Sequence, residues 1–232
     1  MQKRNYQREL EQTLAYLQKE GKVPTLLLHA CCAPCSSYVL EYLSSYFKIT
    51  IFFYNPNISP AAEYEKRVEE LHRLVNELPA VYPIKIIDGL YEPEKFYEMA
   101  RGLEMIPEGG ARCFACYRLR LEETARIARD HGFDYFTTTL SISPLKNAEK
   151  LNTIGEELAG IYQVDYLHSD FKKKNGYKRS IELSTQYGLY RQDYCGCIYS
   201  KQERELQKQK KTGNGSGQDG LPADDTAKTA EE

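Results

Sequence analysis

Short apolar segments alternate with longer amphipathic segments along this 232-residue chain, and this alternation restricts the fold more than any other feature. The apolar segments have the length and residue types of strands and cover residues 25–29, 48–54, 82–87, 135–140 and 164–167. Between them, helical periodicity covers residues 5–20, 36–45, 61–78, 93–101, 113–131, 147–158 and 176–187. This order predicts an α/β fold in which helices cover both faces of a mostly parallel sheet.

The composition changes near residue 201. Residues 1–200 hold the alternating segments and predict a single α/β domain, whereas residues 201–232 form a polar tail. Residues 201–211 are charged and suited to extending a helix. Residues 212–232 are rich in Gly, Ser, Asp, Ala and Thr and have almost nothing to bury, so we expect the tail to end in disorder.

Charge and hydropathy exclude two classes of protein. The chain has 31 Lys and Arg against 33 Asp and Glu, so it is not a globally basic nucleic-acid binder and any RNA contact needs a local patch. No apolar run approaches the roughly 20 residues that span a bilayer. The first five residues lack the apolar stretch of a secretory signal. We therefore expect no membrane partner and a cytoplasmic location.

The seven cysteines fall into three tight groups that lie far apart in the sequence. The first group is Cys31, Cys32 and Cys35, the second is Cys113 and Cys116, and the third is Cys195 and Cys197. An odd number of cysteines in a reducing compartment argues against a disulfide framework. A Cys-x-x-Cys pair places two sulfurs on one metal, so we expect all seven thiols to ligate metal. The spacing favours an iron–sulfur site and leaves open a structural zinc site or a thioredoxin-like dithiol pair.

The predicted sheet suggests where these groups meet. In an open parallel sheet, ligands bind beyond the carboxyl ends of the strands, and the first cysteine group directly follows the first strand. That segment has no glycines, so we predict no phosphate-binding loop there. The second group opens a helix, whose N-terminus together with Arg112 and Arg118 should make both thiols ionise readily. Gly196 should permit the turn that directs both thiols of the third group inward.

Six segments carry further motifs, in the order HACCAPC, FYNPNI, EYEKR, RCFACYRLRL, FTTTLSISPLKN and YRQDYCGC, at residues 29–35, 53–58, 63–67, 112–121, 136–147 and 190–197. Together they resemble the motifs of the QueH-type epoxyqueuosine reductases. The resemblance implies a fold related to the PP-loop (adenine-nucleotide α-hydrolase, HUP-type) sheets. It also implies a [4Fe–4S] cluster with an adjacent mononuclear iron, and reduction of epoxyqueuosine to queuosine at the wobble position of the tRNA anticodon. The implied partners are a queuosine-family tRNA and an external electron donor.

Within this resemblance, Cys113 and Cys116 are expected as cluster ligands, joined by two of Cys31, Cys32, Cys195 and Cys197. The remaining cysteines and Cys35 would hold the second iron. Some members of the family have Asp at the position of Cys35, and a thiolate there would make the second metal site softer.

Reduction of an epoxide to an alkene consumes two electrons and two protons and releases water. Tyr54, Asp193 and Tyr194 are candidates for the proton donor.

His29, at the end of the first strand, is interpreted as a core histidine.

The candidates for RNA contact are cationic and aromatic side chains in the second half of the chain. They are Lys146, Lys150, Lys172, Lys173, Lys174, Lys178, Arg179 and Arg191, with Tyr177 and Tyr190 for stacking on loop bases. The alternative to RNA contact for the lysine run 172–174 is an ordinary solvent-exposed loop. Two other functions stay open: an iron–sulfur tRNA-thiolating enzyme of the same fold, and a zinc-stabilised RNA-binding module.

Overall fold

A five-stranded parallel sheet forms the centre of the molecule. The computed structural model describes residues 4–213, with side chains for residues 4–210. The strands are β1 (Thr25–His29), β2 (Lys48–Phe53), β3 (Lys85–Asp88), β4 (Tyr135–Thr138) and β5 (Asp165–Tyr166). They lie in the order β3-β2-β1-β4-β5, and every neighbouring pair is parallel. The predicted α/β class with a parallel sheet is confirmed, and the strand order is that of a doubly wound sheet.

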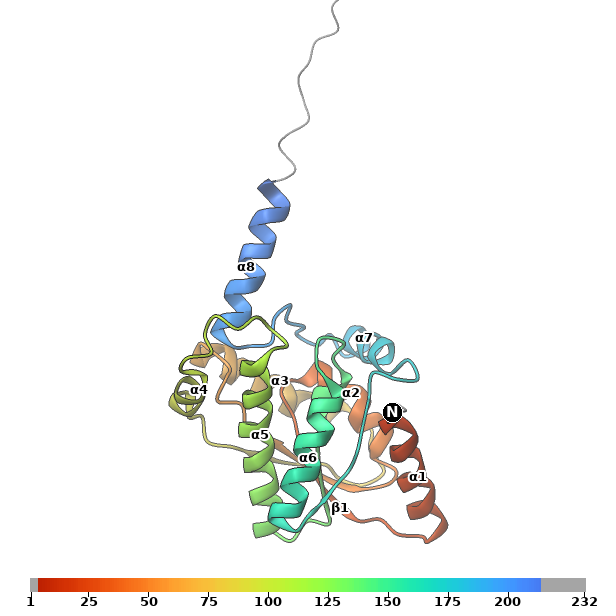
Figure 1. The fold of residues 1–232 in the computed structure, drawn as a ribbon. Helices are drawn as coiled ribbons and strands as arrows, with labels where there is room; N and C mark the ends of the chain where they lie inside the picture. The colour runs from red at the N-terminus through yellow and green to blue at the C-terminus, as the bar shows by residue number, and fades with distance from the viewer. Residues whose placement is uncertain (1–3, 214–232) are drawn as a thin grey trace, which may run out of the picture.

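Helices cover both faces of this sheet (Figure 1). One core unites the strands with α1 (Tyr6–Lys19), α2 (Ala33–Leu43) and α3 (Ala61–Glu77), and a second core unites the other face with α5 (Ala111–Asp130) and α6 (Ala148–Tyr162). Three further elements complete this body: α4 (Pro93–Ala100), η1 (Thr139–Ile142) and α7 (Gly176–Gln186). The last described helix, α8 (Ile198–Gly213), projects away from the body (Figure 1).

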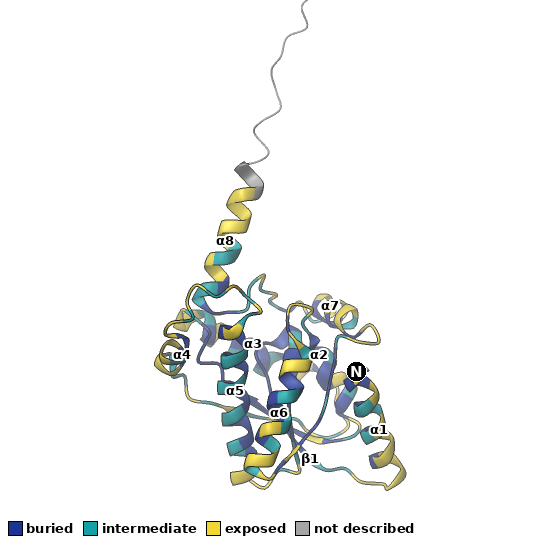
Figure 2. Cartoon of the chain, viewed as in Figure 1, coloured by how far each residue is buried: buried dark blue, intermediate teal, exposed yellow. Residues whose placement is uncertain are grey.

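The central strand β1 is buried on both sides. Side chains alternate along a strand, so Leu26 and Leu28 pack into the first core while Leu27 packs into the second. All three leucines are fully buried, and each contributes about 1.5–3 kcal/mol through the hydrophobic effect. Figure 2 shows the same arrangement for the whole body, with buried residues inside and exposed residues along the outer helix faces. Because both faces of the strand are buried, its three central residues are all apolar instead of alternating with polar ones.

Helix α2 begins three residues earlier than the sequence predicted. Its N-cap is Cys32, which has an extended backbone, and its first residue is Ala33 rather than Ser36. Pro34 fits the first turn because that position needs no backbone N–H donor and its fixed φ is helical. The first cysteine group therefore spans the start of a helix instead of lying wholly in a loop.

The predicted C-terminal tail is partly helical. Helix α8 confirms the predicted extension over residues 201–211 and also includes residues 212 and 213, where disorder was expected. The rest of the predicted disordered segment, residues 214–232, lies outside the described residues. Between residues 4 and 213, no helix combines the length and the apolar character that crossing a bilayer requires.

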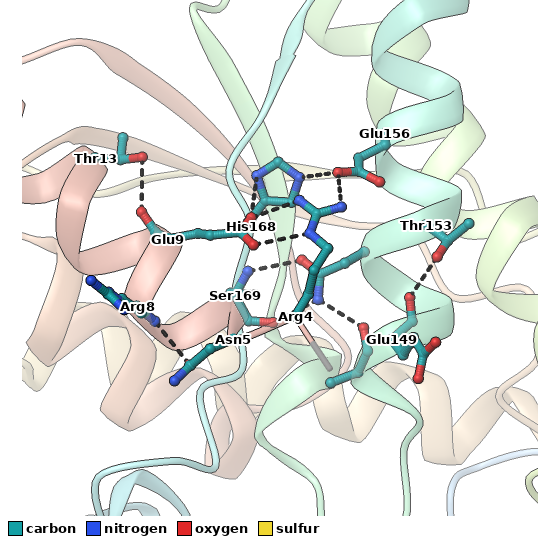
Figure 3. Close-up of polar contacts among 12 residues, drawn as sticks. Arg4, Asn5, Arg8, Glu9, Thr13, Glu149, Thr153, Glu156, His168 and Ser169 are labelled. Carbon is teal, nitrogen blue, oxygen red and sulfur yellow. Dashed lines mark hydrogen bonds and ion pairs between the residues drawn. The ribbon is translucent and has the colours of Figure 1, made fainter. Parts of the chain in front are cut away.

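A cluster of ion pairs and hydrogen bonds connects α1 with α6 (Figure 3). Arg4 pairs with Glu9 at 2.7 Å and with Glu156 at 2.6 Å, and His168 Nε2 lies 2.7 Å from the same Glu156 carboxylate. The side chain of Asn5 caps α1 by accepting a hydrogen bond from the backbone N–H of Arg8. These exposed contacts are individually weak, and together they hold the segment after β5 against both helices.

Candidate metal centre

The topology of the sheet creates a crevice at the carboxyl ends of β1 and β4. The chain proceeds from β1 outward through β2 to β3, then returns to the other side of β1 as β4 and β5, so the winding reverses between β1 and β4. Ligands of open α/β sheets bind at such a switch point. His29 and Thr138 are the last residues of the two strands, and His29 Nδ1 lies 2.9 Å from Thr138 Oγ1. The first cysteine group begins two residues after His29, at Cys31.

The three sulfurs of the first cysteine group lie within 4.8 Å of one another, as close as ligands of one metal. Cys31 Sγ and Cys32 Sγ are 3.8 Å apart. Hydrogen bonds from the Cys32 and Cys35 thiols lower the pKa of Cys31 well below its usual range. The same interaction raises the pKa of Cys32 to about 12, because its proton is held between two sulfurs. One sulfur of the group therefore ionises first, and the group is suited to a metal.

The second and third cysteine groups meet in one small cavity. Cys113 and Cys116 lie in the first two turns of α5, and Cys195 and Cys197 lie just before or at the start of α8, yet all four line the same space. We call it the four-cysteine cavity. A larger open cavity adjoins it and is lined by the first cysteine group, Arg67, Ser143, Pro144, Tyr177, Arg191 and Tyr194, among other residues. Cys195 lines both cavities, so all three groups converge at one edge of the sheet.

The expectation that the thiols of the second group ionise readily is wrong. Burial raises the pKa of Cys113, although its sulfur accepts a hydrogen bond of 3.2 Å from the Gly109 backbone N–H. Burial also raises the pKa of Cys116 to about 12. Helix α5 begins at Ala111, so Cys116 is its sixth residue and lies beyond the first turn, where the helix dipole acts most strongly. Metal binding at these thiols must therefore displace protons.

Buried cations surround the sulfurs. Lys146 Nζ donates to Cys195 Sγ at 3.1 Å and pairs with Glu108 at 2.9 Å. Arg67 pairs with Glu63 at 2.7 Å and donates to the Cys195 carbonyl at 3.3 Å. The positive charges favour sulfur in its anionic form, which is the form that binds metals.

Of the two arginines predicted beside the second cysteine group, Arg112 lines the four-cysteine cavity and Arg118 does not; Arg120 is a further arginine of α5 at the site. Cys113, Cys116 and Arg120 follow one another at intervals of three and four residues and share one face of the helix. Arg120 is 1% exposed and lines both cavities. Arg118 points to the opposite side, where it forms an exposed pair with Glu157 of α6. Helical spacing counted from Cys113 is the sequence signal that identifies Arg120.

His29 is a neutral core residue, as the sequence analysis interpreted it. Burial, reinforced by the charge of Arg120, lowers its pKa to about 3. Nε2 lies 3.1 Å from the Tyr54 carbonyl, which can only accept, so this nitrogen carries the proton. Nδ1 then accepts from Thr138 Oγ1, and the pair joins β1 to β4 directly beneath the first cysteine group.

The three candidate proton donors occupy different environments. Tyr54 is 2% exposed, stacks on Phe52 and lines neither cavity. Asp193 lines the open cavity, but its carboxylate pairs with Lys208 at 2.6 Å, which holds the pKa of Asp193 below its usual range. Tyr194 also lines the open cavity, and burial raises its pKa, so its hydroxyl keeps its proton. Of the three, Tyr194 combines access to the cavity with a proton to donate.

The candidate RNA contacts are distributed over several surfaces. Tyr177, Arg191 and Lys146 line the open cavity, but Lys146 is buried and engaged with sulfur, so it is not a surface contact. Lys174 pairs with Glu11 and Arg179 pairs with Glu41, both away from the cavity. The remaining candidates also do not line it: Lys150, Lys172, Lys173, Lys178 and Tyr190.

Gly196 makes the turn that the third cysteine group requires. Its φ is +113°, a conformation that side chains of L-residues rarely adopt. Its carbonyl accepts a hydrogen bond of 3.0 Å from the Ser59 backbone N–H, which fixes the turn against the segment that follows β2. A Cβ at this position would lie 3.0 Å from both Arg67 Nη1 and Ile58 Cγ1. The predicted role of Gly196 in this turn is therefore supported by its backbone.

Fold and site together define an α/β protein whose sheet edge carries a cysteine cluster suited to a metal. Comparison with known proteins is consistent with this class. The profile of the family described as "Epoxyqueuosine reductase QueH" matches residues 26–203. The chain belongs to the epoxyqueuosine reductase QueH family, which confirms the resemblance seen in the six sequence segments.

Curated relatives support the same assignment. The epoxyqueuosine reductase QueH of Staphylococcus epidermidis is 45% identical over 209 residues, which cover 88% of each chain. That of Streptococcus pyogenes is 44% identical over 201 residues, or 86% of this chain and 79% of the relative. That of Thermotoga maritima is 37% identical over 186 residues, or 78% and 92%. A solved structure, "predicted subunit of tRNA methyltransferase" from Methanocaldococcus jannaschii, covers 69% of this chain and 74% of its own with 14% identity and a TM-score of 0.45.

Proposed function

We propose that the convergence of the three cysteine groups is the active site at which this chain reduces epoxyqueuosine to queuosine in tRNA. As a member of its family the chain is an epoxyqueuosine reductase, an enzyme of tRNA modification that carries out the last step of queuosine biosynthesis. The observation that supports this placement is the meeting of seven thiols from three distant segments beside an open cavity.

The donor set of the four-cysteine cavity fits a [4Fe–4S] cluster. Four thiols suit the four irons of such a cluster. Four residues that line this cavity have buried polar groups without a hydrogen-bond partner: the Asn57 amide, Arg112 Nε, Tyr117 Oη and Arg120 Nη2. Unpaired donors are costly inside a protein, and inorganic sulfide and thiolate sulfur both accept hydrogen bonds. Cys113, Cys116, Cys195 and Cys197 are therefore the proposed cluster ligands.

The first cysteine group fits the proposed mononuclear iron. Its three sulfurs lie within 4.8 Å of one another and would hold one ion, and all three residues line the open cavity, from which substrate would approach. When bound, such a cluster would supply single electrons that come from an external donor, and the second iron would supply a Lewis acid for the epoxide oxygen.

The side chains of the open cavity would handle the protons and the substrate. Tyr194 holds a proton on Oη in the wall of the open cavity, which the first cysteine group also lines, and it is the proposed proton donor. The Lys146 ammonium donates to the Cys195 sulfur and pairs with the Glu108 carboxylate. These two contacts orient Cys195 between the two cavities. The reaction needs two protons, and water that reaches the open cavity supplies the second.

The tRNA contact is proposed around the mouth of the open cavity. Tyr177 and Arg191 lie there together, and the Arg191 guanidinium is 6.0 Å from the centre of the Tyr177 ring. An aromatic ring and a cation suit an unstacked loop base and its phosphate. The cytoplasmic location stays a prediction.

One experiment separates the proposed function from its alternatives. The full chain is purified without oxygen, its iron, sulfide and zinc are quantified, and it is incubated with epoxyqueuosine-containing tRNA and dithionite. We expect iron with sulfide and conversion of the nucleoside to queuosine, with loss of one oxygen atom. Zinc without iron or sulfide, and no conversion, would favour the zinc-stabilised RNA-binding module. Gain of sulfur by the tRNA would favour a thiolating enzyme.

A further inference from the structure

Arg120 differs from the other cations buried around the cysteines in its lack of a carboxylate partner. Each of the others is paired, as Arg67 with Glu63, Arg112 with Glu203 and Lys146 with Glu108. No ion pair within the described part of the chain includes Arg120, although its guanidinium is almost completely buried. A buried charge without a counter-ion is costly, so this position requires negative charge from another source.

The contacts of Arg120 leave its charge uncompensated. Nε donates to the Cys116 carbonyl at 3.3 Å, and Nη1 donates to Asn55 Oδ1 at 3.3 Å. Both acceptors are neutral, and Nη2 has no hydrogen-bond partner. The Asn55 side chain is itself fixed, because its Nδ2 donates to the Ala30 carbonyl at 2.8 Å. The guanidinium is thus held in place with one donor group available.

The position of Arg120 identifies where the missing negative charge lies. It lines the four-cysteine cavity and also the open cavity that contains the first cysteine group. The second and third cysteine groups line the first of these cavities, and the first cysteine group lines the second. One cation therefore faces sulfur from all three groups.

We propose that Arg120 is a positioning residue whose charge balances the metal-bound thiolates of both cysteine sites and raises the potential at which the centre is reduced. This inference rests on the proposed function, in which both sites hold iron. One-electron reduction by an external donor adds one negative charge and forms no bond. A fixed cation beside the centre stabilises the more negative state, so the electron is accepted more readily.

The test compares two variants of Arg120 with a matched control on the same helix. Arg120→Gln keeps hydrogen-bond donors and removes the charge, whereas Arg120→Lys keeps the charge. Arg118→Gln removes an exposed cation from the other face of α5 and breaks only a surface pair. The reduction of each anaerobically purified full-length protein is followed by its visible absorbance during titration with dithionite at controlled potential.

We expect Arg120→Gln to lower the equilibrium constant for one-electron reduction by about tenfold, a shift of about 59 mV to more negative potential. Arg120→Lys should stay closer to wild type, and Arg118→Gln should match it. Arg120→Gln could lose its iron, and its potential could then not be measured. In that case, an Arg120→Lys protein that keeps its iron and has a reduction potential close to wild type supports the role of charge.

Three results would overturn the inference: an Arg120→Gln potential equal to that of Arg118→Gln, an Arg120→Lys potential as low as that of Arg120→Gln, or loss of iron from Arg120→Lys. A wild-type protein without iron would instead overturn the proposed function, so the two failures are distinguishable.

Discussion

Replacing Gly196 with Ala adds one methyl group at the turn between Cys195 and Cys197, and it should weaken both the fold and the metal site. The φ of +113° is strained for alanine by about 1–3 kcal/mol. The new Cβ would lie 3.0 Å from Arg67 Nη1 and from Ile58 Cγ1, which is closer than ordinary van der Waals contact. Both neighbours are buried and have little room to move, so overpacking adds about 1–3 kcal/mol.

These two costs relax partly together, so we expect Gly196→Ala to lower the free energy of unfolding by about 2 kcal/mol or more. In a domain of this size, such a change lowers Tm by about 4–8 °C. Relief of the strain displaces the turn and with it the thiols of the third cysteine group. Iron content should therefore fall together with Tm.

Thermal unfolding and iron quantification of the anaerobically purified protein test this reasoning, with Gly132→Ala as the matched control. Gly132 follows α5 with a φ of +67°, and nothing lies within 4 Å of a Cβ placed there. This control carries backbone strain of about 1–2 kcal/mol and should keep its full iron content. Wild-type Tm and iron content in Gly196→Ala, or equal loss of iron from Gly132→Ala, would refute the argument.

Three further predictions follow from the site and the sheet. Cys116→Ala should abolish the visible chromophore and the activity while the chain stays folded, as measured by iron content, turnover and circular dichroism. Arg191→Ala should weaken tRNA binding and reduce its salt dependence by about one phosphate contact, as measured by titration at several salt concentrations. Asp134 accepts two hydrogen bonds from Thr25, which lower its carboxyl pKa, so the unfolded chain binds the proton more tightly. The resulting stabilisation is complete above the unfolded pKa of about 3.9 and is lost as the pH falls below it, and Asp134→Asn should reduce this acid dependence in urea unfolding.

Each of these predictions has a contradicting outcome. Full iron content and turnover in Cys116→Ala would remove that residue from the ligands. For tRNA binding the control is Arg129→Ala, because Arg129 lies in the last turn of α5, at the opposite edge of the sheet. If Arg129→Ala weakens tRNA binding as much as Arg191→Ala, Arg191 makes no specific contact with the tRNA. If the free energy of unfolding of Asp134→Asn falls with acid pH as steeply as that of the wild type, the hydrogen bonds between Asp134 and Thr25 do not contribute to the acid dependence of stability.

The strands and most helices were predictable because their residues satisfy local rules. Thr25–His29 was predicted to the residue, because three consecutive leucines between Pro24 and the cysteines are typical of a short buried strand. The predicted start of α2 at residue 36 is wrong because Pro34 fits the first turn of a helix and does not prevent it. Cap and proline positions are determined by local chemistry, so attention to Cys32 and Pro34 would have corrected this boundary.

Predictions about the site failed where tertiary burial outweighs local chemistry. The N-terminal position of Cys113 and Cys116 in α5 suggested easy ionisation, but the surrounding core raises the pKa of both thiols. Lys146 was predicted as an RNA contact from its charge, yet the loop after η1 turns it into the sulfur-lined interior. The convergence of the cysteines was predictable, because the carboxyl ends of parallel strands share one edge.

Anomalous diffraction at the iron absorption edge, from crystals of the anaerobically purified protein, tests the central claim most directly. The account predicts one strong peak among Cys113, Cys116, Cys195 and Cys197 and a second peak among Cys31, Cys32 and Cys35. Absence of iron from both positions, or a single peak at the zinc edge instead, would contradict it.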